Sequence, residues 1–503
     1  MLSFAPGIHG MPVLSKSKIM AFRQCPKRLW LEVHHPELRE DSAQTRASFA
    51  AGHVVGDVAR QVYDPEGQGV LIDVEALGFP GVFEATRQAL ATRRPVFEAA
   101  FTDGQALALA DVLLPVEDGQ WRMVEVKSST SVKPYHREDV ALQARLARSQ
   151  GVGLTGVSVA HVDSSWVYTG GGDYRGLLTE VDLTEEALGR DTKAGEWVAR
   201  ALAVVSQPEV PPVSTGAHCS KPYECGFSGH CSSQEPQAEY PVAWLPRMRA
   251  GDWLARGITD MRQLPAASLD ALQFRVRHST LTQEPFFDRV GAQAALARHP
   301  LPAYFLDFET IGAAVPLWAD THPYQQVPFQ YSLHHLDAQG RLSHSAFLDL
   351  SGADPALALT TQLVRECGDH GPIFVYNISF ESGRIAELAT RFPQWAAELQ
   401  AIRSRLVDLL PITRSHYYHP TQHGSWSIKA VLPTMVPELG YDALGGVQNG
   451  GQAQEAYLEA VDAATSPERR QALEQQLLRY CQLDTYAMVR IWQLLAQRTD
   501  WNL

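Results

Sequence analysis

The sequence predicts an α/β protein of several domains, and three observations lead to this prediction. The chain has 503 residues, more than one ordinary hydrophobic core organises. Segments with alternating apolar residues, typical of strands, are interspersed with segments of helical periodicity. A stretch rich in Pro, Ser, Gly and Cys, residues 208–237, interrupts these patterns. We therefore expect two α/β domains, residues 12–235 and 299–503, with a small helical module over 236–298 between them.

The first of these domains is predicted to contain a strand meander flanked by helices. Ser15 has the position of a helix N-cap, and Cys25-Pro26 interrupts the helix that follows it. Strands are expected over residues 96–116, as a hairpin turning at 102–104, and over 121–127 and 153–168; helices are expected over 49–62, 138–149 and 184–205.

The C-terminal half repeats the mixture of strands and helices with a different order. Residues 240–290 are apolar-periodic with short breaks and indicate a helical module. Beyond it, strands are expected over residues 303–308, 329–336, 344–350 and 373–376, and helices over 356–366 and 468–497.

Composition narrows the class of protein. Hydrophobic residues make up 45% and charged residues 20% of the chain, as in ordinary globular proteins. No apolar run approaches the ~18 residues that span a bilayer, and the first ten residues show neither a basic segment nor a cleavage pattern. We therefore expect a cytoplasmic protein without a membrane partner. The net charge of −13 argues against a generic polyelectrolyte binder, but not against centres that hold cations with carboxylates.

Two acids and a lysine form the first candidate site. The segment before Asp111 and the segment that ends at Lys127 both alternate as strands, so Glu125 and Lys127 share one face. If these strands pair, Asp111 joins them. Two carboxylates suit Mg²⁺ or Mn²⁺, and a lysine beside them can activate water or stabilise phosphate charge. Gln143, on the next helix, is expected to position the nucleophile or the backbone; a charged surface hairpin is the alternative.

Four cysteines form the second candidate site. Cys25 stands alone, whereas Cys219, Cys225 and Cys231 follow together much later in the chain. Four thiolates suit a [4Fe–4S] cluster or structural zinc, and so few cysteines in a long chain do not make a disulfide scaffold. Such a cluster would tie the start of the N-terminal domain to its end and order the polar segment around it. Free buried cysteines are the alternative.

Carboxylates of the C-terminal half form the third candidate site. Asp307 and Glu309 share one face at the end of a hydrophobic strand. Glu381 lies at a strand-to-helix junction, and Tyr480 and Asp484 share one face of a helix. This set suits a two-metal phosphodiesterase, in which Tyr480 would hold the attacking water or the scissile phosphate. A structural fold without catalysis is the alternative.

The N-terminal motifs resemble those of the PD-(D/E)XK nucleases of the RecB/AddB type, including the RecB-like nucleases of CRISPR adaptation. The matching residues are Ser15-x-Ser17, Cys25-Pro26, Asp111, Glu125-Val126-Lys127, Gln143, Cys219, Cys225 and Cys231. The resemblance implies a restriction-endonuclease-like fold, with Asp111 and Glu125 as metal ligands. It favours a [4Fe–4S] cluster over zinc because it includes the distant Cys25.

This family often completes the metal shell with a histidine on an early helix. Here the expected position falls nearer Gly56 than His53, so that His53 or Glu98 would take over this role.

The C-terminal motifs resemble those of the DnaQ-like, DEDD-type 3′–5′ exonucleases with a tyrosine in the third motif. The matching residues are Asp307, Glu309, Glu381, Tyr480 and Asp484. The resemblance implies an RNase H-like fold, with Asp307, Glu309 and Asp484 as metal ligands. The second motif of this family normally carries Asp where this chain has Glu381, and Asp408 is a further candidate for that role.

Together the resemblances imply a fusion of an iron–sulfur RecB-like nuclease with a DnaQ-like exonuclease. We predict a hydrolase that degrades or trims single-stranded or frayed DNA from the 3′ end, in DNA repair or antiviral defence. Single strands are favoured because a narrow metal cleft admits one strand most easily. No G-x-x-x-x-G-K-[ST] motif occurs, so unwinding would require a helicase partner. The alternatives are an RNA-trimming exoribonuclease and a non-catalytic nucleic-acid-binding protein with a structural cluster.

Overall fold

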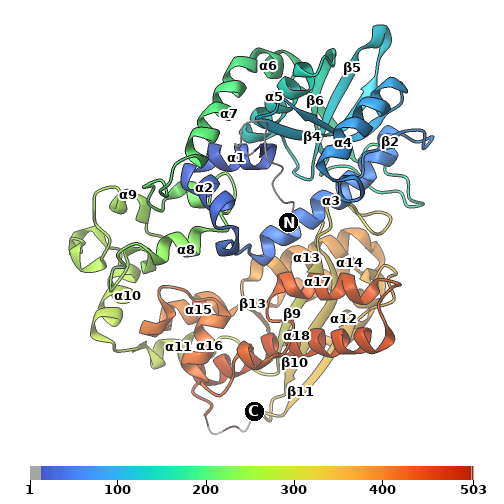
Figure 1. The fold of residues 1–503 in the computed structure, drawn as a ribbon. Coiled ribbons are helices and arrows are strands. Elements are labelled where there is room, and N and C mark those ends of the chain that lie inside the picture. The colour runs from blue at the N-terminus through green and yellow to red at the C-terminus, as the bar shows by residue number, and fades with distance from the viewer. Residues whose placement is uncertain (1–12, 500, 502–503) are drawn as a thin grey trace. The chain divides into compact units, whose positions relative to one another are not determined.

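The computed structural model describes residues 13–499 and 501, and these form two compact units (Figure 1). Unit 1 takes in the chain up to residue 236 together with residues 313–325; unit 2 takes in residues 237–312 and the chain from 326 onward. Both units combine helices with sheet, so the predicted multidomain α/β class is confirmed at this level. The expected limits at residues 12 and 503 lie outside the described residues. Within the described chain, no helix has the length and apolar character needed to cross a membrane.

A seven-stranded sheet forms the centre of unit 1. Its path is β2-β3-β4-β5-β6-β7, and β1 pairs with β4 beside this path. The strands are β1 (Leu14–Ser15), β2 (Val70–Leu71), β3 (Val96–Thr102), β4 (Ala106–Pro115), β5 (Trp121–Lys127), β6 (Leu154–Val162) and β7 (Leu178–Asp182). The predicted β3–β4 hairpin is confirmed. Its turn is held by Asp103, whose carboxylate accepts hydrogen bonds from the backbone N–H groups of Gln105 and Ala106.

Helices cover both faces of this sheet (Figure 1). The helices of unit 1 that the structure describes are α1 (Lys16–Gln24), α2 (Pro26–His34), η1 (Pro36–Leu38), α3 (Ala43–Tyr63), α4 (Val74–Ala91), η2 (Glu117–Gly119), α5 (Pro134–Ser149), α6 (Thr184–Gly189), α7 (Asp191–Val205), η3 (Ala217–Cys219) and α8 (Ser228–Ser233); α3, α4 and α5 are among those that contact the sheet directly. Met123 of β5 is buried in the same cluster as Val140 of α5, whereas Val124 lies in a different cluster. Because side chains alternate along a strand, Glu125 and Lys127 continue the face that Met123 turns toward α5.

Several predicted bounds in unit 1 are wrong for identifiable reasons. The strand expected over residues 153–168 ends at Val162, because Asp163 begins a turn by accepting a hydrogen bond from the backbone of Ser165. The helix expected from residue 138 already begins at Pro134, since proline suits the first helical turn. The single helix expected over 184–205 is two helices that meet at Arg190.

Residues 313–325 follow the first strand of unit 2 in sequence but belong to unit 1. Ala314 and Val315 are buried in one hydrophobic cluster with side chains of α3 and β6. Thr321 forms an isolated antiparallel bridge with Tyr168. The hydroxyl group of Tyr324 donates a hydrogen bond to the backbone oxygen of Ser128, directly after β5. Unit 1 is therefore completed by a segment that lies far beyond it in sequence.

Unit 2 is built on a five-stranded mixed sheet with the order β11-β10-β9-β12-β13. The strands are β9 (Ala303–Ile311), β10 (Val327–Leu336), β11 (Leu342–Leu348), β12 (Ile373–Val375) and β13 (Leu406–Asp408); β8 (Phe286–Phe287) and β14 (Tyr417–Tyr418) form a separate pair. β9, β10 and β11 are antiparallel, whereas β12 runs parallel to both β9 and β13. The four strands predicted for this half are confirmed, and β13 was not predicted.

The helices of unit 2 include the predicted helical module and a long C-terminal helix. They are η4 (Val242–Trp244), α9 (Ala250–Leu254), η5 (Met261–Gln263), η6 (Ala266–Ser268), α10 (Ala271–Thr282), α11 (Arg289–Leu296), α12 (Ala356–Glu366), α13 (Ile378–Arg391), η7 (Pro393–Trp395), α14 (Ala396–Ser404), α15 (Leu409–His416), η8 (Pro420–Gln422), α16 (Ile428–Met435), η9 (Tyr441–Ala443), α17 (Gly450–Val461) and α18 (Pro467–Leu495). Val242 and Val276 of the module are buried in the same cluster as Phe305 of β9 and Trp492 of α18. The module therefore shares the core of the sheet that follows it.

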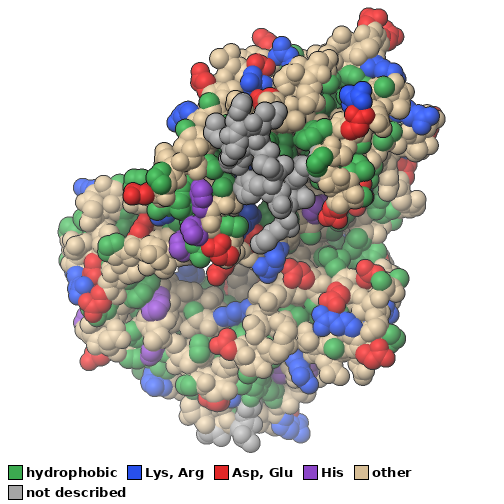
Figure 2. Space-filling model, viewed as in Figure 1, with side chains coloured by type: hydrophobic (Ala, Val, Ile, Leu, Met, Phe, Trp, Pro, Cys, Tyr) green, Lys and Arg blue, Asp and Glu red, His purple; other side chains and the backbone are tan. Residues whose placement is uncertain are grey.

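Acidic and basic side chains are interspersed on the face shown in Figure 2, rather than gathered by sign.

Candidate functional site

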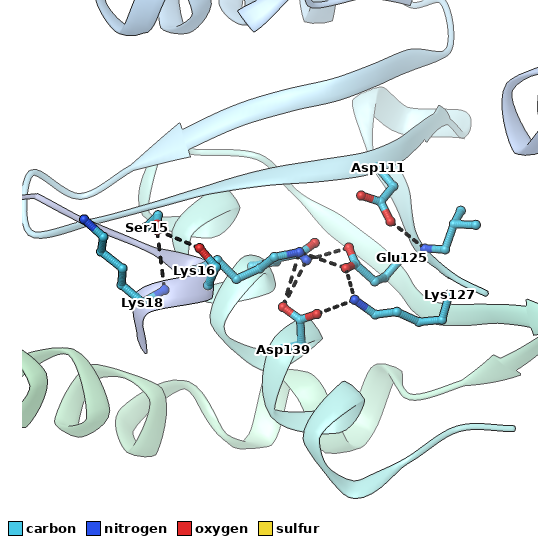
Figure 3. A network of polar contacts seen from close by, with 10 residues as sticks. Ser15, Lys16, Lys18, Asp111, Glu125, Lys127 and Asp139 are labelled. Carbon is cyan, nitrogen blue, oxygen red and sulfur yellow. Dashed lines mark hydrogen bonds and ion pairs between the residues drawn. The ribbon is translucent and has the colours of Figure 1, made fainter. Parts of the chain in front are cut away.

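The first candidate site lies where β4 and β5 separate. The two strands pair only from Val112 to Pro115 on β4, and the start of β4 pairs with β1 instead. Beyond the last paired residues, Asp111 connects the strands through its side chain: its Oδ2 atom accepts a hydrogen bond from the backbone N–H of Val126 at 2.7 Å. Asp111 and Glu125 thus lie just beyond the end of the paired stretch, next to each other at this fork (Figure 3).

Four charged side chains next to Asp111 form a closed ring, which we call the charge ring: Lys16, Glu125, Lys127 and Asp139. Oε1 of Glu125 accepts hydrogen bonds from Nζ of Lys127 at 2.6 Å and from Nζ of Lys16 at 2.8 Å. Oδ2 of Asp139 accepts from Lys127 at 2.6 Å, and its Oδ1 lies 3.3 Å from Nζ of Lys16. Positive and negative groups therefore alternate around the ring (Figure 3).

The predicted residues Glu125 and Lys127 are half of this ring, and the sequence analysis missed the other half. Asp139 lies on α5 one turn before Gln143, so the two share a helix face. Lys16 is the first residue of α1, and Ser15 before it caps that helix as predicted. The i to i+4 spacing of Asp139 and Gln143 was a usable signal, whereas nothing local distinguishes Lys16 from other lysines.

Gln143 lies beside Glu125, as the sequence analysis expected. Its side chain is completely buried, and Nε2 donates to Oε2 of Glu125 at 2.5 Å. Within the part of the chain that the structure describes, its Oε1 atom has no hydrogen-bond partner. A buried amide oxygen without a partner is unusual in a folded protein and is suited to accept from a water or a ligand.

The lysines of the charge ring are held in their charged form. Burial alone would lower the pKa of Lys127, but the carboxylates of Asp139 and Glu125 outweigh it and raise this pKa well above its usual value. Burial likewise favours a neutral Asp139, yet Lys127 and Lys16 lower its pKa far below the usual range. At neutral pH, Lys127 is therefore a cation that can stabilise negative charge, not a general base.

Glu98 adds a third acid to the fork. Its neighbours Phe97 and Ala99 pair with Val112 and Ala110, so Glu98 lies directly across from Asp111. Its φ of 57° is unusual for a non-glycine residue. Burial, followed by the charge of Glu125, raises the pKa of Glu98, and the same two causes raise the pKa of Asp111 well above its usual value. Like charges in this arrangement are unfavourable unless a cation joins them.

The four predicted cysteines line one small pocket that is partly open to solvent. Cys25 separates α1 from α2, Cys219 ends η3, and Cys231 lies in α8. The loop between the late cysteines is tied to α1 by Gln24, whose Nε2 donates to the backbone oxygens of residues 218 and 223, each at 2.7 Å. Among the described residues, no three of the cysteine sulfurs lie within 4.8 Å of one another.

The third candidate site gathers at β9 and α18 of unit 2. Ligand atoms of Asp307, Glu309 and Cys481 lie within 4.8 Å of one another. One turn after Tyr480, the Oδ1 atom of Asp484 accepts a hydrogen bond from the hydroxyl group of Tyr441 at 2.5 Å. The sequence analysis missed Cys481 and Tyr441; the latter lies in an irregular segment with no periodic pattern.

Burial and mutual repulsion dominate the electrostatics of this site. Burial, then Asp484 and Glu309, raise the pKa of Asp307 well above its usual value. Burial and Asp484 do the same for Glu309. Burial also raises the pKa of Asp484 to about 6, against the hydrogen bond from Tyr441 and the charge of Lys429, which lower it. Asp307 and Glu309 therefore hold their protons to a higher pH than free carboxyl groups do, and a divalent cation would replace those protons.

Glu381 lies in the first turn of α13 with 2% of its surface exposed. Burial raises its pKa to about 8, and its charge acts on Asp307. Asp408, the further candidate for this role, is occupied otherwise. Its carboxylate accepts hydrogen bonds from the backbone N–H groups of Asn377 and Ile378, each at 3.1 Å, and of Leu410 at 3.0 Å. Asp408 thus holds the turn that presents Glu381.

The structure is that of an α/β protein with a carboxylate cluster in each unit. The family described as "Domain of unknown function (DUF2779)" matches residues 304–427, which include β9 and Glu381 and end before α18. Over 208 residues the chain is 27% identical to "Uncharacterized protein MG366" of Mycoplasma genitalium, and over 206 residues it is 28% identical to "Uncharacterized protein MG366 homolog" of Mycoplasma pneumoniae. Each match covers 37% of this chain and 31% of the length of the relative.

The chain is also similar to a solved structure described as "Crystal structure of SSO0001". The match has 14% sequence identity and a TM-score of 0.23, and it covers 44% of this chain and 87% of that one.

Proposed function

We propose that the protein is a metal-dependent DNA nuclease whose unit 2 is a 3′–5′ exonuclease for single-stranded or frayed ends. One observation carries the proposal: ligand atoms of Asp307 and Glu309 lie within 4.8 Å of each other beside Asp484, and burial, together with the charge of Asp484, raises the pKa values of Asp307 and Glu309. Folding tolerates such a cluster when cations bind it. Carboxylate oxygens are the ligands that Mg²⁺ and Mn²⁺ prefer.

Each residue of this centre has a role in the proposed reaction. Asp307, Glu309 and Asp484 would hold the metal, which when bound activates water and neutralises phosphate charge. Tyr480 would orient the attacking water or the scissile phosphate. Nζ of Lys429 lies 3.5 Å from the hydroxyl oxygen of Tyr480 and keeps this side of the centre positive. Glu381, buried with one carboxylate oxygen unpartnered among the described residues, would supply the remaining acid.

The fold of unit 2 supports this proposal. The first three strands of its sheet are antiparallel and the last two are parallel, an arrangement compatible with the RNase H-like fold. The acids lie on β9, the central strand, and on α18, which packs in the same core. The match to a family of unknown function covers β9 and Glu381 and favours no other activity.

We propose a second nuclease centre of the PD-(D/E)XK type in unit 1. Asp111 and Glu125 would hold Mg²⁺ or Mn²⁺ at the strand fork, and Lys127 would stabilise charge on the phosphate. The observation in favour is that Lys127 stays charged in a buried position beside both acids. Gln143 holds Glu125 in place and would offer its unpartnered oxygen to the nucleophilic water.

For the four cysteines we propose a [4Fe–4S] cluster, with zinc as the alternative. A single zinc ion holds its sulfur ligands at about 2.3 Å, hence roughly 3.8 Å from one another in a tetrahedron. Among the described residues, no three of these sulfurs lie within 4.8 Å of one another, so a single zinc ion would have to draw them together. The resemblance, which includes the distant Cys25, favours the larger cluster. Burial raises the pKa values of the Cys225 and Cys231 thiols, so a bound metal would have to displace their protons. The proposed role is structural, closing unit 1 around α1.

The decisive experiment measures cleavage of end-labelled single-stranded DNA and matching RNA with Mn²⁺ or Mg²⁺, using protein purified without oxygen. Asp307→Asn should abolish a 3′-to-5′ ladder on DNA, whereas Asp369→Asn, which changes an exposed carboxylate of the same unit, should leave it intact. A ladder lost only with Lys127→Ala would move the activity to unit 1. Cleavage of RNA alone would favour an exoribonuclease, and no cleavage of either polymer would favour a binding protein. DNA repair and antiviral defence, with a helicase as partner, are the proposed settings.

A further inference from the structure

Lys16 enters the strand fork through a local structure that leaves it little freedom. Ser15 belongs to β1 and pairs with Leu107 of β4, and its Oγ accepts a hydrogen bond from the backbone N–H of Lys18 at 3.4 Å. The chain therefore changes from strand to helix at Lys16, whose side chain runs into the space between β4 and β5. Lys18 extends away from this space (Figure 3). Lys16 is 20% exposed and contacts both acids of the charge ring.

The hydrogen bonds divide the fork into two sides. Glu125 accepts two ammonium groups on Oε1 and the amide of Gln143 on Oε2, which occupies three of its roughly four lone-pair positions. The two oxygens of Asp139 face Lys127 and Lys16. On the other side, Asp111 uses Oδ2 for Val126, and no hydrogen bond reaches its Oδ1 within residues 13–499. The Asp139 side is therefore filled by lysines, and the Asp111 side has carboxylate oxygen to spare.

The ammonium groups of Lys16 and Lys127 both donate to Oε1 of Glu125 and repel each other. Ion pairing with Glu125 alone therefore does not explain why both lysines are present. Asp139 reduces the repulsion because it lies against both Nζ atoms. The result is a neutral ring with two fixed positive charges directed at the place where Asp111 and Glu125 meet. In a two-metal nuclease, positive charge at such a place comes from the second cation.

We propose that Lys16 is a positioning residue of the unit 1 centre. Its ammonium group supplies the positive charge that a second divalent cation would otherwise bring. This centre therefore takes one divalent cation, on its Asp111 side. The inference deepens the proposed nuclease function of unit 1 and rests on it. A phosphate group approaching that cation would meet two lysines at fixed distances, which favours one orientation of the substrate.

The first test counts bound Mn²⁺ in the full-length protein, which requires no activity. A parent with Asp307→Asn and Glu309→Gln removes metal ligands from unit 2, and Lys16→Met is added to it because methionine keeps the length and apolar contacts of the lysine stem. Equilibrium dialysis should show one more Mn²⁺ per chain in Lys16→Met than in the parent. Lys16→Arg, which keeps the charge, and the matched control Lys18→Met should show the parental number. An unchanged number in Lys16→Met overturns the inference.

The second test measures how cleavage by the same variants depends on Mn²⁺. Lys16→Met should lower kcat by about 100-fold, as removal of a charge-stabilising group does, with KM little changed, and the dependence on Mn²⁺ should become steeper. Lys16→Arg should recover part of kcat, and Lys18→Met all of it. A Lys16→Met variant that melts at a lower temperature but keeps the parental kcat and Mn²⁺ dependence assigns Lys16 a purely structural role. If the parent itself does not cut, the proposed nuclease function of unit 1 fails, whereas the count of bound Mn²⁺ still decides the role of Lys16.

Discussion

The two carboxylate clusters of this chain differ in how the repulsion between their neighbouring acids is compensated. In unit 1, Glu125 and Asp139 are each paired with two lysines, and these lysines lower the pKa of Asp139. In unit 2, burial raises the pKa values of Asp307, Glu309 and Asp484, and the charge of Asp484 raises those of Asp307 and Glu309 further, whereas Lys429 lowers the pKa values of Glu309 and Asp484. Under the proposed function, the unit 1 centre with its own cations would be ordered before metal binds, whereas the unit 2 centre would exchange protons for metal. The two should therefore differ in stability, in pH dependence and in their response to metal.

The largest expected difference is in the stability effect of removing one charge from each cluster. Lys127→Met leaves Glu125 and Asp139 buried with a single cation, and breaking a buried ion pair in this way costs about 4 kcal/mol. Glu309→Gln instead imitates the protonated acid and relieves repulsion, so the free energy of unfolding should rise. Urea denaturation without divalent cations at pH 8 measures both changes. Equal destabilisation by the two substitutions would contradict the contrast between the clusters.

Asp484 of unit 2 should contribute to the pH dependence of stability. The pKa of Asp484 is raised from 3.8 to about 6, so between these values the folded state holds a proton that the unfolded state releases. Stability therefore falls as pH rises from about 4 to 6, by about 3 kcal/mol for a shift of this size. Asp484→Asn should reduce this slope by the contribution of Asp484, and saturating Mg²⁺ should reduce it further. The measurement is the urea midpoint across this pH range; a slope that is unchanged in Asp484→Asn assigns it to other groups.

Unit 1 should also depend on residues 313–325, although they follow β9 in sequence. A fragment that ends at residue 236 lacks Val315, which is buried against Val55 and Val162. It also lacks Tyr324, which bonds to the backbone after Lys127. Loss of the valine alone removes about 2 kcal/mol of burial. Thermal unfolding should show a less stable fragment, and joining residues 313–325 through a flexible linker should restore stability, whereas a scrambled segment should not. Equal melting temperatures for all three would contradict this assignment.

The sequence predicted site residues whose contacts follow from the alternation or helical periodicity of their own segment, and it missed residues brought in by tertiary packing. The β3–β4 hairpin and β5 alternate clearly, and their pairing alone brings Asp111 to Glu125. Lys16 was not predictable in this way, because β1 has two residues and its pairing with β4 joins segments far apart in sequence. In unit 2, Asp307 and Glu309 are marked by their strand and Asp484 by its helix. Tyr441 reaches Asp484 from an irregular segment whose position depends on tertiary packing.

Tyr441 offers the finest test of the unit 2 cluster. Tyr441→Phe removes the hydrogen bond to Oδ1 of Asp484, which helps to keep this acid ionised. Loss of one such bond costs about 1 kcal/mol, and the Mg²⁺ concentration for half-maximal cleavage should rise about fivefold as a result. Tyr457→Phe is the matched control, because the Tyr457 hydroxyl is buried without a hydrogen-bond partner among the described residues and its removal should leave metal dependence unchanged. If Tyr441→Phe and Tyr457→Phe need the same Mg²⁺, Asp484 does not depend on its tyrosine partner. The protons of this cluster would then be governed by burial and repulsion alone.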